Sequence, residues 1–171
     1  MKKIIAFLLS LSLVFCLAAC TTPVTDDTQK PGEGKQPVAD SFSFTHNGTK
    51  IALHAPMADI LTGLGEPKSY SESASCAFDG LDKTYDYGSF IIQTYPLDGK
   101  DYVYMFWFND DLVTNDEGIC ITSTLAEVQA AYGTEGYNGT NAYNITKGSG
   151  QLIIILENDA VSSIQYVITA E

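Results

Sequence analysis

The sequence predicts an α+β fold with two tandem repeats, each a helix followed by an antiparallel meander, joined into one sheet with the helices on one face. Two observations predict this fold. The stretch HAPMADILTGLG, which begins at His54, is matched 68 positions later by TSTLAEVQAAYG, which begins at Thr122. Each stretch is followed by runs of β-branched and aromatic residues, which are typical of strands. The repeats are expected to cover about 50–114 and 118–169, within one domain over 41–171.

The first stretch predicts a short strand over 51–53 and then a helix over 56–64. Pro56 suits the first helical position, because the missing N–H group of proline is not needed there. Gly65 can adopt a positive φ and end the helix, and Pro67 prevents the helix from continuing.

The second stretch predicts a short strand over 119–121 and then a helix over 125–132. Thr124 precedes Glu127 by three residues, which is the spacing of a capping box. Gly133 takes the same place after this helix that Gly65 takes after the first.

The strands after the two helices are expected to form two meanders of unequal length. In the first repeat they are expected at about 75–78, 84–87, 89–95, 101–108 and 112–114, and in the second at about 142–146, 151–157 and 161–169. The Asn109-Asp110 and Asn158-Asp159 pairs are expected to make turns. The first repeat therefore carries an extra strand.

Residues 1–19 have the composition of a secretory signal peptide. Lys2 and Lys3 precede an apolar run over 4–17 that is too short to span a membrane, and the segment ends in Leu-Ala-Ala before Cys20. This ending resembles the lipobox of bacterial lipoproteins. The resemblance implies cleavage before Cys20, its diacylation with palmitate-type chains on a diacylglycerol group, and anchoring at the extracytoplasmic face of the cell membrane. The alternative is a secreted protein in which Cys20 carries no lipid.

The charge balance excludes nucleic acid as a partner. Removal of Lys2 and Lys3 with the signal peptide leaves seven of the nine basic residues against 21 acidic ones, a net charge of −14 without any arginine. Nucleic-acid binding requires a basic surface. Residues 20–40 are rich in Thr, Pro, Gly and Asp, and they are expected to form a flexible tether between the membrane and the folded domain.

The repeat pattern, an Ile-x-Ile strand followed by a short helix, a glycine and a meander, resembles the repeat unit of β-lactamase inhibitor protein-like domains. Ile119-Cys120-Ile121 and Glu127-Val128 carry this resemblance best. It implies a helix-plus-sheet architecture. The chain departs from the family in the glycine usual before the helix, which is His54 or Thr122 here, and in the disulfide within each repeat. No partner-contacting residue is transferred.

Two cysteines remain in the folded part, Cys76 and Cys120. They are expected to form either a disulfide or a pair of reduced thiols, and both alternatives stay open. The chain has no CxxC motif, so neither a redox motif nor a zinc site is expected.

No enzymatic motif stands out, and we expect a non-enzymatic protein without a cofactor or a metal. Of the two histidines, His54 is expected at a strand end near the surface. Ser-x-x-Lys and Gly-x-Ser-x-Gly arrangements are absent. The acidic loop FNDDLVTNDEG, which begins at Phe108, does not have the spacing of a calcium loop.

The segment 101–108, DYVYMFWF, predicts a central strand with apolar residues on both faces. On a regular strand Tyr102, Tyr104, Phe106 and Phe108 share one face, and Val103, Met105 and Trp107 share the other. Phe106, Phe108, Met105 and Trp107 are expected in the core. The tyrosines are expected either in the core or in a wall that binds an unknown protein or peptide, or alternatively a small molecule or glycan. The residues of this wall are Tyr85, Tyr87, Gln93, Tyr95, Tyr102 and Tyr104.

Overall fold

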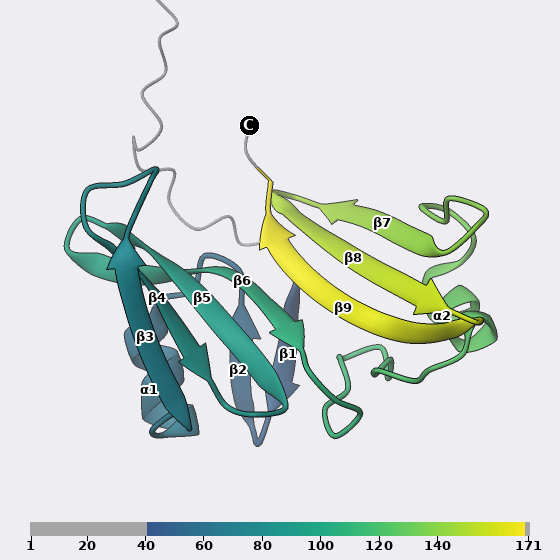
Figure 1. Ribbon diagram of the computed structural model, residues 1–171, viewed down its shortest axis with the longest axis horizontal. Helices are drawn as coiled ribbons and strands as arrows, with labels where there is room; N and C mark the ends of the chain where they lie inside the picture. Colours follow the sequence, from purple (N-terminus) through teal and green to yellow (C-terminus); the bar gives the residue numbers. More distant parts are fainter. Residues whose placement is uncertain (1–40, 170–171) are drawn as a thin grey trace, which may run out of the picture.

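A seven-stranded antiparallel sheet in the order β3-β4-β5-β6-β9-β8-β7 forms the body of the structure (Figure 1). The computed structural model describes residues 41–169. The strands of this sheet are β3 (Ser69–Ala74), β4 (Leu81–Asp86), β5 (Phe90–Leu97), β6 (Lys100–Phe108), β7 (Ala142–Lys147), β8 (Gly150–Glu157) and β9 (Ala160–Ile168). A separate hairpin contains β1 (Ser43–His46) and β2 (Thr49–Ala52), and the two helices are α1 (Met57–Leu64) and α2 (Leu125–Tyr132). The chain is therefore α+β and mainly β.

The sheet consists of two meanders that meet at β6 and β9. Four strands follow α1 and three follow α2. β6 is the fourth of the seven strands, as its two-sided apolar pattern predicts. Residues 105–108 of β6 pair with residues 164–167 of β9, and this short ladder joins the two meanders into one sheet.

The helices and the β1–β2 hairpin lie behind the sheet in the view of Figure 1, and no described helix or strand lies in front of it. The core fills the space between these two layers. Phe44 of β1 is fully buried and lies 5.0–5.2 Å, ring centre to ring centre, from Phe90, Phe106 and Phe108 of the sheet. Met57 and Ile60 of α1 and Val128 of α2 belong to the same buried cluster. Within residues 41–169 no helix has the length and apolarity that crossing a membrane requires.

The helix predictions are confirmed. The hydroxyl group of Thr124 accepts a hydrogen bond from the Glu127 backbone, and the Glu127 carboxylate accepts one from the Thr124 backbone, which completes the capping box. Pro56 stands just before α1 rather than inside it. Gly65 and Gly133 end the helices with φ of 75° and 72°.

The loop before each helix is hydrogen bonded to a strand of the sheet. The N–H group of His54 donates to the Val103 carbonyl oxygen at 2.9 Å, and the N–H group of Thr122 donates to the Val161 carbonyl oxygen at 2.8 Å. His54 and Thr122 both have positive φ, 63° and 78°. These loops therefore fix the positions of the helices relative to β6 and β9.

Several strand predictions differ from the structure. The first strand of the first meander, β3, occupies 69–74 instead of the predicted 75–78. Its sequence SYSESA is polar, and it forms a strand because backbone pairing with β4 does not need apolar side chains at a sheet edge. Residues 112–114 and 119–121 do not form strands. They belong to the long connection between β6 and α2.

Asn115 organises this connection. Its side chain is buried; its Nδ2 donates to the hydroxyl oxygens of Tyr132 and Tyr166 at 2.7 and 2.9 Å, and its Oδ1 accepts from the Ile119 N–H group at 2.7 Å. The Tyr132 hydroxyl group donates to the Glu117 carboxylate at 3.0 Å. Burial raises the pKa values of both tyrosines above their ordinary range, so both hydroxyl groups stay protonated.

Replacing Asn115 tests this network. We expect Asn115→Ala to lower the free energy of unfolding by about 2–3 kcal/mol, because buried polar groups lose their partners. Urea denaturation followed by circular dichroism measures the loss. Asn109→Ala, which removes one hydrogen bond from an exposed side chain, should cost about 1 kcal/mol or less. Equal losses for the two variants would show that the connection does not depend on Asn115.

Candidate functional site

The face of the sheet that points away from the helices is the candidate site, and Trp107 lies at its centre. Phe106 and Phe108 point into the core and are 0% and 4% exposed. Because side chains alternate along a strand, Trp107 points to the other face. Met105 points the same way as Trp107, and both side chains are half-buried.

The four central strands build this surface, which we call the open face. Trp107 pairs with Ile91 of β5 on one side and with Gln165 of β9 on the other. The open face consists of half-buried apolar and amide side chains: Ile91, Gln93, Met105, Trp107, Gln151, Ile153, Gln165 and Val167. The Nε2 atom of Gln165 lies 3.9 Å from the Met105 sulfur. None of these eight side chains carries a charge, although the chain has a net charge of −12.

The prediction that Met105 and Trp107 belong to the core is therefore wrong. Both faces of β6 are apolar, as the sequence indicates, but helices and the β1–β2 hairpin cover only one of them (Figure 1). The alternation within β6 cannot reveal which face remains uncovered, because that depends on elements distant in the chain.

A β-bulge at Tyr104 changes which residues share a face. Gln93 pairs with Met105 and the next residue of β5, Thr94, pairs with Val103, so Tyr104 has no partner. Val103 and Phe106 consequently both face the core. Tyr104 does not share a face with Phe106 and Phe108, as a regular strand would require.

The structure does not bring the six predicted wall residues together. Tyr85 is buried in the core, and Tyr87 is half-buried, with its hydroxyl group donating to the Gly65 carbonyl oxygen at 3.1 Å. Tyr95 is buried and its ring lies 5.9 Å from that of Tyr102, which is half-buried. Tyr104 is 37% exposed at the bulge. Only Gln93 contributes to the open face.

His54 is buried, not near the surface as expected, and links the two meanders. Its Nδ1 lies 3.0 Å from the Tyr95 hydroxyl oxygen and its Nε2 lies 2.9 Å from the Ser149 hydroxyl oxygen. Tyr95 belongs to β5, whereas Ser149 lies in the turn between β7 and β8. Burial lowers the pKa of His54, so the neutral imidazole is favoured in the folded protein.

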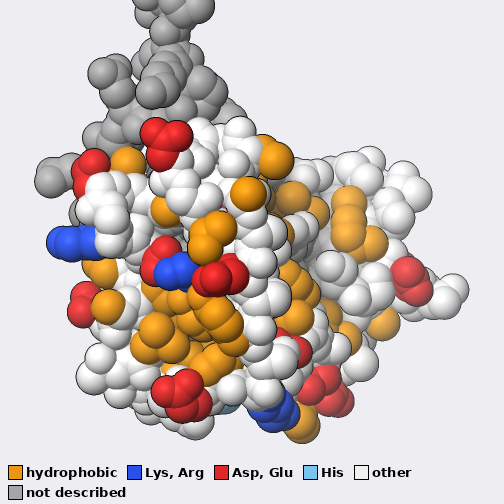
Figure 2. Space-filling model, turned by 60° about the vertical axis from the view of Figure 1, so that its left-hand side comes forward, with side chains coloured by type: hydrophobic (Ala, Val, Ile, Leu, Met, Phe, Trp, Pro, Cys, Tyr) orange, Lys and Arg blue, Asp and Glu red, His pale blue; other side chains and the backbone are white. Residues whose placement is uncertain are grey.

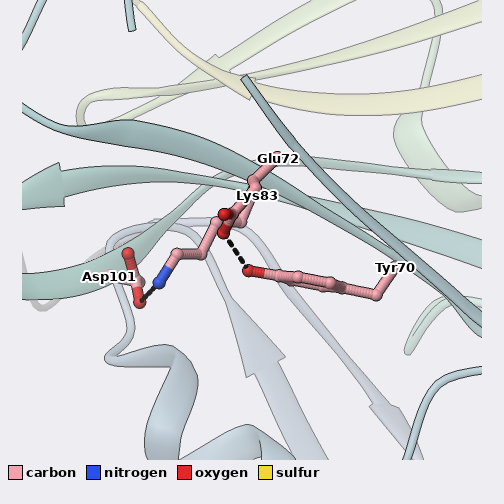
Figure 3. A network of polar contacts seen from close by, with 4 residues as sticks. All are labelled: Tyr70, Glu72, Lys83 and Asp101. Carbon is pink, nitrogen blue, oxygen red and sulfur yellow. Dashed lines mark hydrogen bonds and ion pairs between the residues drawn. The ribbon is translucent and has the colours of Figure 1, made fainter. Parts of the chain in front are cut away.

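A polar network lies on the helix side of the sheet near its β3 edge (Figure 3). The Tyr70 hydroxyl group donates to the Glu72 carboxylate at 2.7 Å, which raises the pKa of Tyr70 to about 12. The Lys83 ammonium group donates to the Asp101 carboxylate at 2.8 Å. Figure 2 turns the left-hand side of Figure 1, where β3 lies, toward the viewer, and charged side chains border a hydrophobic area there. Tyr70 is 49% exposed.

Cys76 and Cys120 are free thiols and do not form the disulfide that was one of the two alternatives. Cys76 is exposed and Cys120 is half-buried. Across the described residues, no three His, Cys, Asp or Glu side chains gather in a way that would hold a metal ion. Cys20 and the signal peptide lie outside the described residues.

Comparisons with known proteins assign no family. No protein-family model matches the chain, and no curated protein matches it. A solved structure of an extracellular protein that contains an SCP domain, from Bacillus anthracis, is similar to this chain with a TM-score of 0.41 and 10% sequence identity. The similarity covers 68% of this chain and 44% of the Bacillus anthracis chain, so it spans less than half the length of that protein.

The burial of His54 predicts a pH dependence of stability. The pKa of His54 is lower in the folded than in the unfolded state, so below pH 6.5, the ordinary value for histidine, the unfolded state binds more protons than the folded state does. We expect the contribution of His54 to the free energy of unfolding to be constant above pH 6.5 and to decrease as the pH falls below it. Urea denaturation at pH 7.5 and pH 5 measures the decrease.

A variant tests this assignment. His54→Gln should remove part of the decrease, because glutamine does not titrate. An unchanged pH dependence in His54→Gln would contradict the assignment.

Proposed function

We propose that the chain is a non-enzymatic lipoprotein, tethered to the extracytoplasmic face of the membrane through Cys20, that binds a protein or peptide with its open face. The N-terminal pattern of Lys2, Lys3, an apolar run and Leu-Ala-Ala-Cys supports the anchor. The tether over 20–40 would hold the domain at a distance from the bilayer. Its acidic surface would be repelled by anionic lipid, which would leave the open face accessible to a partner.

We also propose that the fold consists of two tandem copies of one unit, and a set of repeated contacts supports this duplication. Corresponding residues of the two helix stretches, 68 positions apart, make corresponding backbone contacts. His54 and Thr122 occupy equivalent places, with positive φ and a hydrogen bond to a valine carbonyl oxygen in the last strand of each meander. The glycine after each helix repeats the same φ and the same hydrogen bond, from Gly65 to the Leu61 carbonyl oxygen and from Gly133 to the Gln129 carbonyl oxygen. We infer two copies of one helix-plus-meander unit.

The bulges and tyrosines of the two meanders add to this inference. Ser162 is the unpaired residue directly after Val161, as Tyr104 is directly after Val103. Tyr87 and Tyr143 each donate a hydroxyl hydrogen bond, at 3.1 Å, to the carbonyl oxygen of the glycine after a helix. Fused copies of this kind place two meanders edge to edge, which produces a sheet face wider than one unit would have.

The open face carries the functional part of the proposal. It is an uncharged surface with Trp107, Met105 and Ile153 at its centre, on a strongly acidic chain. Aromatic and methionine side chains are enriched in the buried centres of protein interfaces, and charged side chains are depleted there. A tryptophan surrounded by half-buried neighbours is also typical of residues that dominate binding energy.

A glycan or other small molecule is the alternative ligand. Gln93, Gln151 and Gln165 place three amide groups around the apolar centre, and each amide can both donate and accept hydrogen bonds. Such groups suit the hydroxyl groups of a neutral sugar as well as the backbone of a peptide.

The open face can be tested by photo-crosslinking in the producing cells. With a benzophenone amino acid at Gln165, we expect one covalent protein adduct, and we expect Trp107→Ala to reduce it by tenfold or more, a loss of about 1.4 kcal/mol. The same cross-linker at Leu112, which is 79% exposed outside the open face, is the control. An adduct that forms equally from both positions would contradict the proposal.

The alternative has a separate readout. Trp107 is the only tryptophan of the chain, so its fluorescence reports on the open face. A shift of this emission on addition of soluble cell-wall glycan fragments, together with no protein adduct, would favour the glycan over the protein.

The anchor is tested at Cys20. We expect mass spectrometry of the mature protein to show an N-terminal cysteine with a diacylglyceryl group. Cys20→Ala should remove the lipid and prevent cleavage at this site, because the lipobox cysteine is required. A mature N-terminus elsewhere, without lipid, would show a secreted protein.

A further inference from the structure

The two edges of the sheet are protected to different degrees. At the β7 edge, the segment before the strand covers the outer backbone groups: the Asn144 N–H group donates to the Gly136 carbonyl oxygen at 2.9 Å, and the Asn138 N–H group donates to the Ala142 carbonyl oxygen at 2.8 Å. At the β3 edge, no described element lies beside the strand (Figure 1), and all six residues of β3 are exposed.

The register of β3 identifies the backbone groups that face outward. The Ser75 N–H group donates to the Gly80 carbonyl oxygen at 3.0 Å, so residue 75 faces β4. Along a strand of an antiparallel pair, the backbone N–H and C=O groups of every second residue point toward the partner strand, and those of the residues between them point away from it. Ser69, Ser71 and Ser73 therefore bond to β4, whereas Tyr70, Glu72 and Ala74 direct their N–H and C=O groups away from the sheet. Within the described part of the chain, no backbone hydrogen bond reaches these outward groups.

An exposed edge of this length is either blocked by charge or used for binding. β3 contains no proline and no bulge in its register with β4. Its single charged residue is Glu72, which accepts a hydrogen bond from the Tyr70 hydroxyl group. Lys83, which is opposite Glu72 in β4, bonds to Asp101 instead. Among the described residues Glu72 forms no ion pair, so its charge is available to a partner.

We propose that β3 binds an extended segment of a partner protein, which adds to the sheet as a further antiparallel or parallel strand and places a lysine or arginine beside Glu72. The backbone groups of Tyr70, Glu72 and Ala74 supply the affinity, and the acidic side chain selects the sign of the partner's charge. The site does not depend on the open face, since it uses the edge of the sheet rather than its surface.

Charge argues against a second copy of this chain as the occupant. Antiparallel pairing of two β3 strands would bring the two Glu72 side chains onto neighbouring positions, and like charges that close destabilise a strand pair. The net charge of −12 on each copy adds to this repulsion.

The edge can be tested with the peptide acetyl-Thr-Lys-Val-Lys-Val-Lys-Thr-amide and amide hydrogen exchange of the full chain, measured by NMR. In the free protein, we expect the amides of Tyr70, Glu72 and Ala74 to exchange rapidly and those of Ser71 and Ser73 slowly. With saturating peptide, the three outward amides should slow by at least about tenfold, while the amides of β7 stay unchanged. Slow exchange of the outward amides in the free protein, or a peptide effect centred elsewhere, would overturn the proposal.

Two variants separate the backbone contribution from the charge. Glu72→Pro removes one outward N–H group, which an edge strand tolerates, and should abolish peptide binding. Glu72→Gln keeps the strand and should weaken binding about three- to fivefold, as expected for one exposed ion pair.

Two control variants should leave the peptide affinity unchanged. One is Glu66→Gln, which changes an exposed acid outside β3, and the other is Trp107→Ala on the open face. Equal binding of a peptide in which glutamate replaces each lysine would refute the role of Glu72. Slower exchange of the outward amides that depends on the concentration of the protein, and not on that of the peptide, would show pairing between copies and overturn the proposal.

Discussion

The pairing of β6 with β9 is the interaction on which the rest of the structure depends. Residues 105–108 and 164–167 form a ladder that is as short as the one between β4 and β5 and shorter than the other ladders of the seven-stranded sheet, yet it makes one sheet from two meanders. Beyond this ladder the two strands separate, and the loop before α1 pairs with β6 instead, through His54 and Val103. The imidazole of His54 then connects Tyr95 of one meander to Ser149 of the other. The joint is thus a short backbone ladder continued by one buried polar cluster.

The same joint explains why the open face exists. Each meander uses one face to bury its helix, and edge-to-edge joining places both helices and the β1–β2 hairpin on the same side (Figure 1). The opposite side consequently has no described element to cover it. The residues that meet across the joint, Trp107 with Gln165 and Met105 with Val167, are apolar or amide side chains instead of the acidic ones common elsewhere in the chain. An uncharged strip on an acidic domain is consistent with a surface that becomes buried on binding.

The sequence predicts the local features of this fold well because they depend on neighbouring residues. The capping box of Thr124 and Glu127, the glycine stops and the β8–β9 hairpin at Asn158-Asp159 follow from short-range chemistry. The central position of β6 follows from its apolar faces. The polar strand β3 could not be predicted in the same way, because its formation depends on pairing with β4 rather than on its own side chains.

The candidate site was less predictable, since it depends on long-range pairing. The bulge at Tyr104 reverses the alternation along β6, and nothing in DYVYMFWF announces it. The buried imidazole of His54 is hydrogen bonded to Ser149, which lies 95 residues away in the chain. A signal for the open face does exist in the sequence: uncharged residues stand at every second position of β5, β8 and β9, at Ile91 and Gln93, at Gln151 and Ile153, and at Gln165 and Val167. Its assembly into one surface requires the strand order, which alternation does not provide.

The most direct test of this account is an NMR measurement of the contact between β6 and β9. Trp107 and Gln165 do not exchange backbone hydrogen bonds, because those of Trp107 go to β5, as the Asn109 N–H bond to the Ser89 carbonyl oxygen shows. Their Cα atoms are then about 4.5 Å apart. We expect strong Hα–Hα nuclear Overhauser effects between Trp107 and Gln165 and between Met105 and Val167. Absence of both signals, with those between β5 and β6 and between β8 and β9 intact, would mean two separate sheets and no continuous open face.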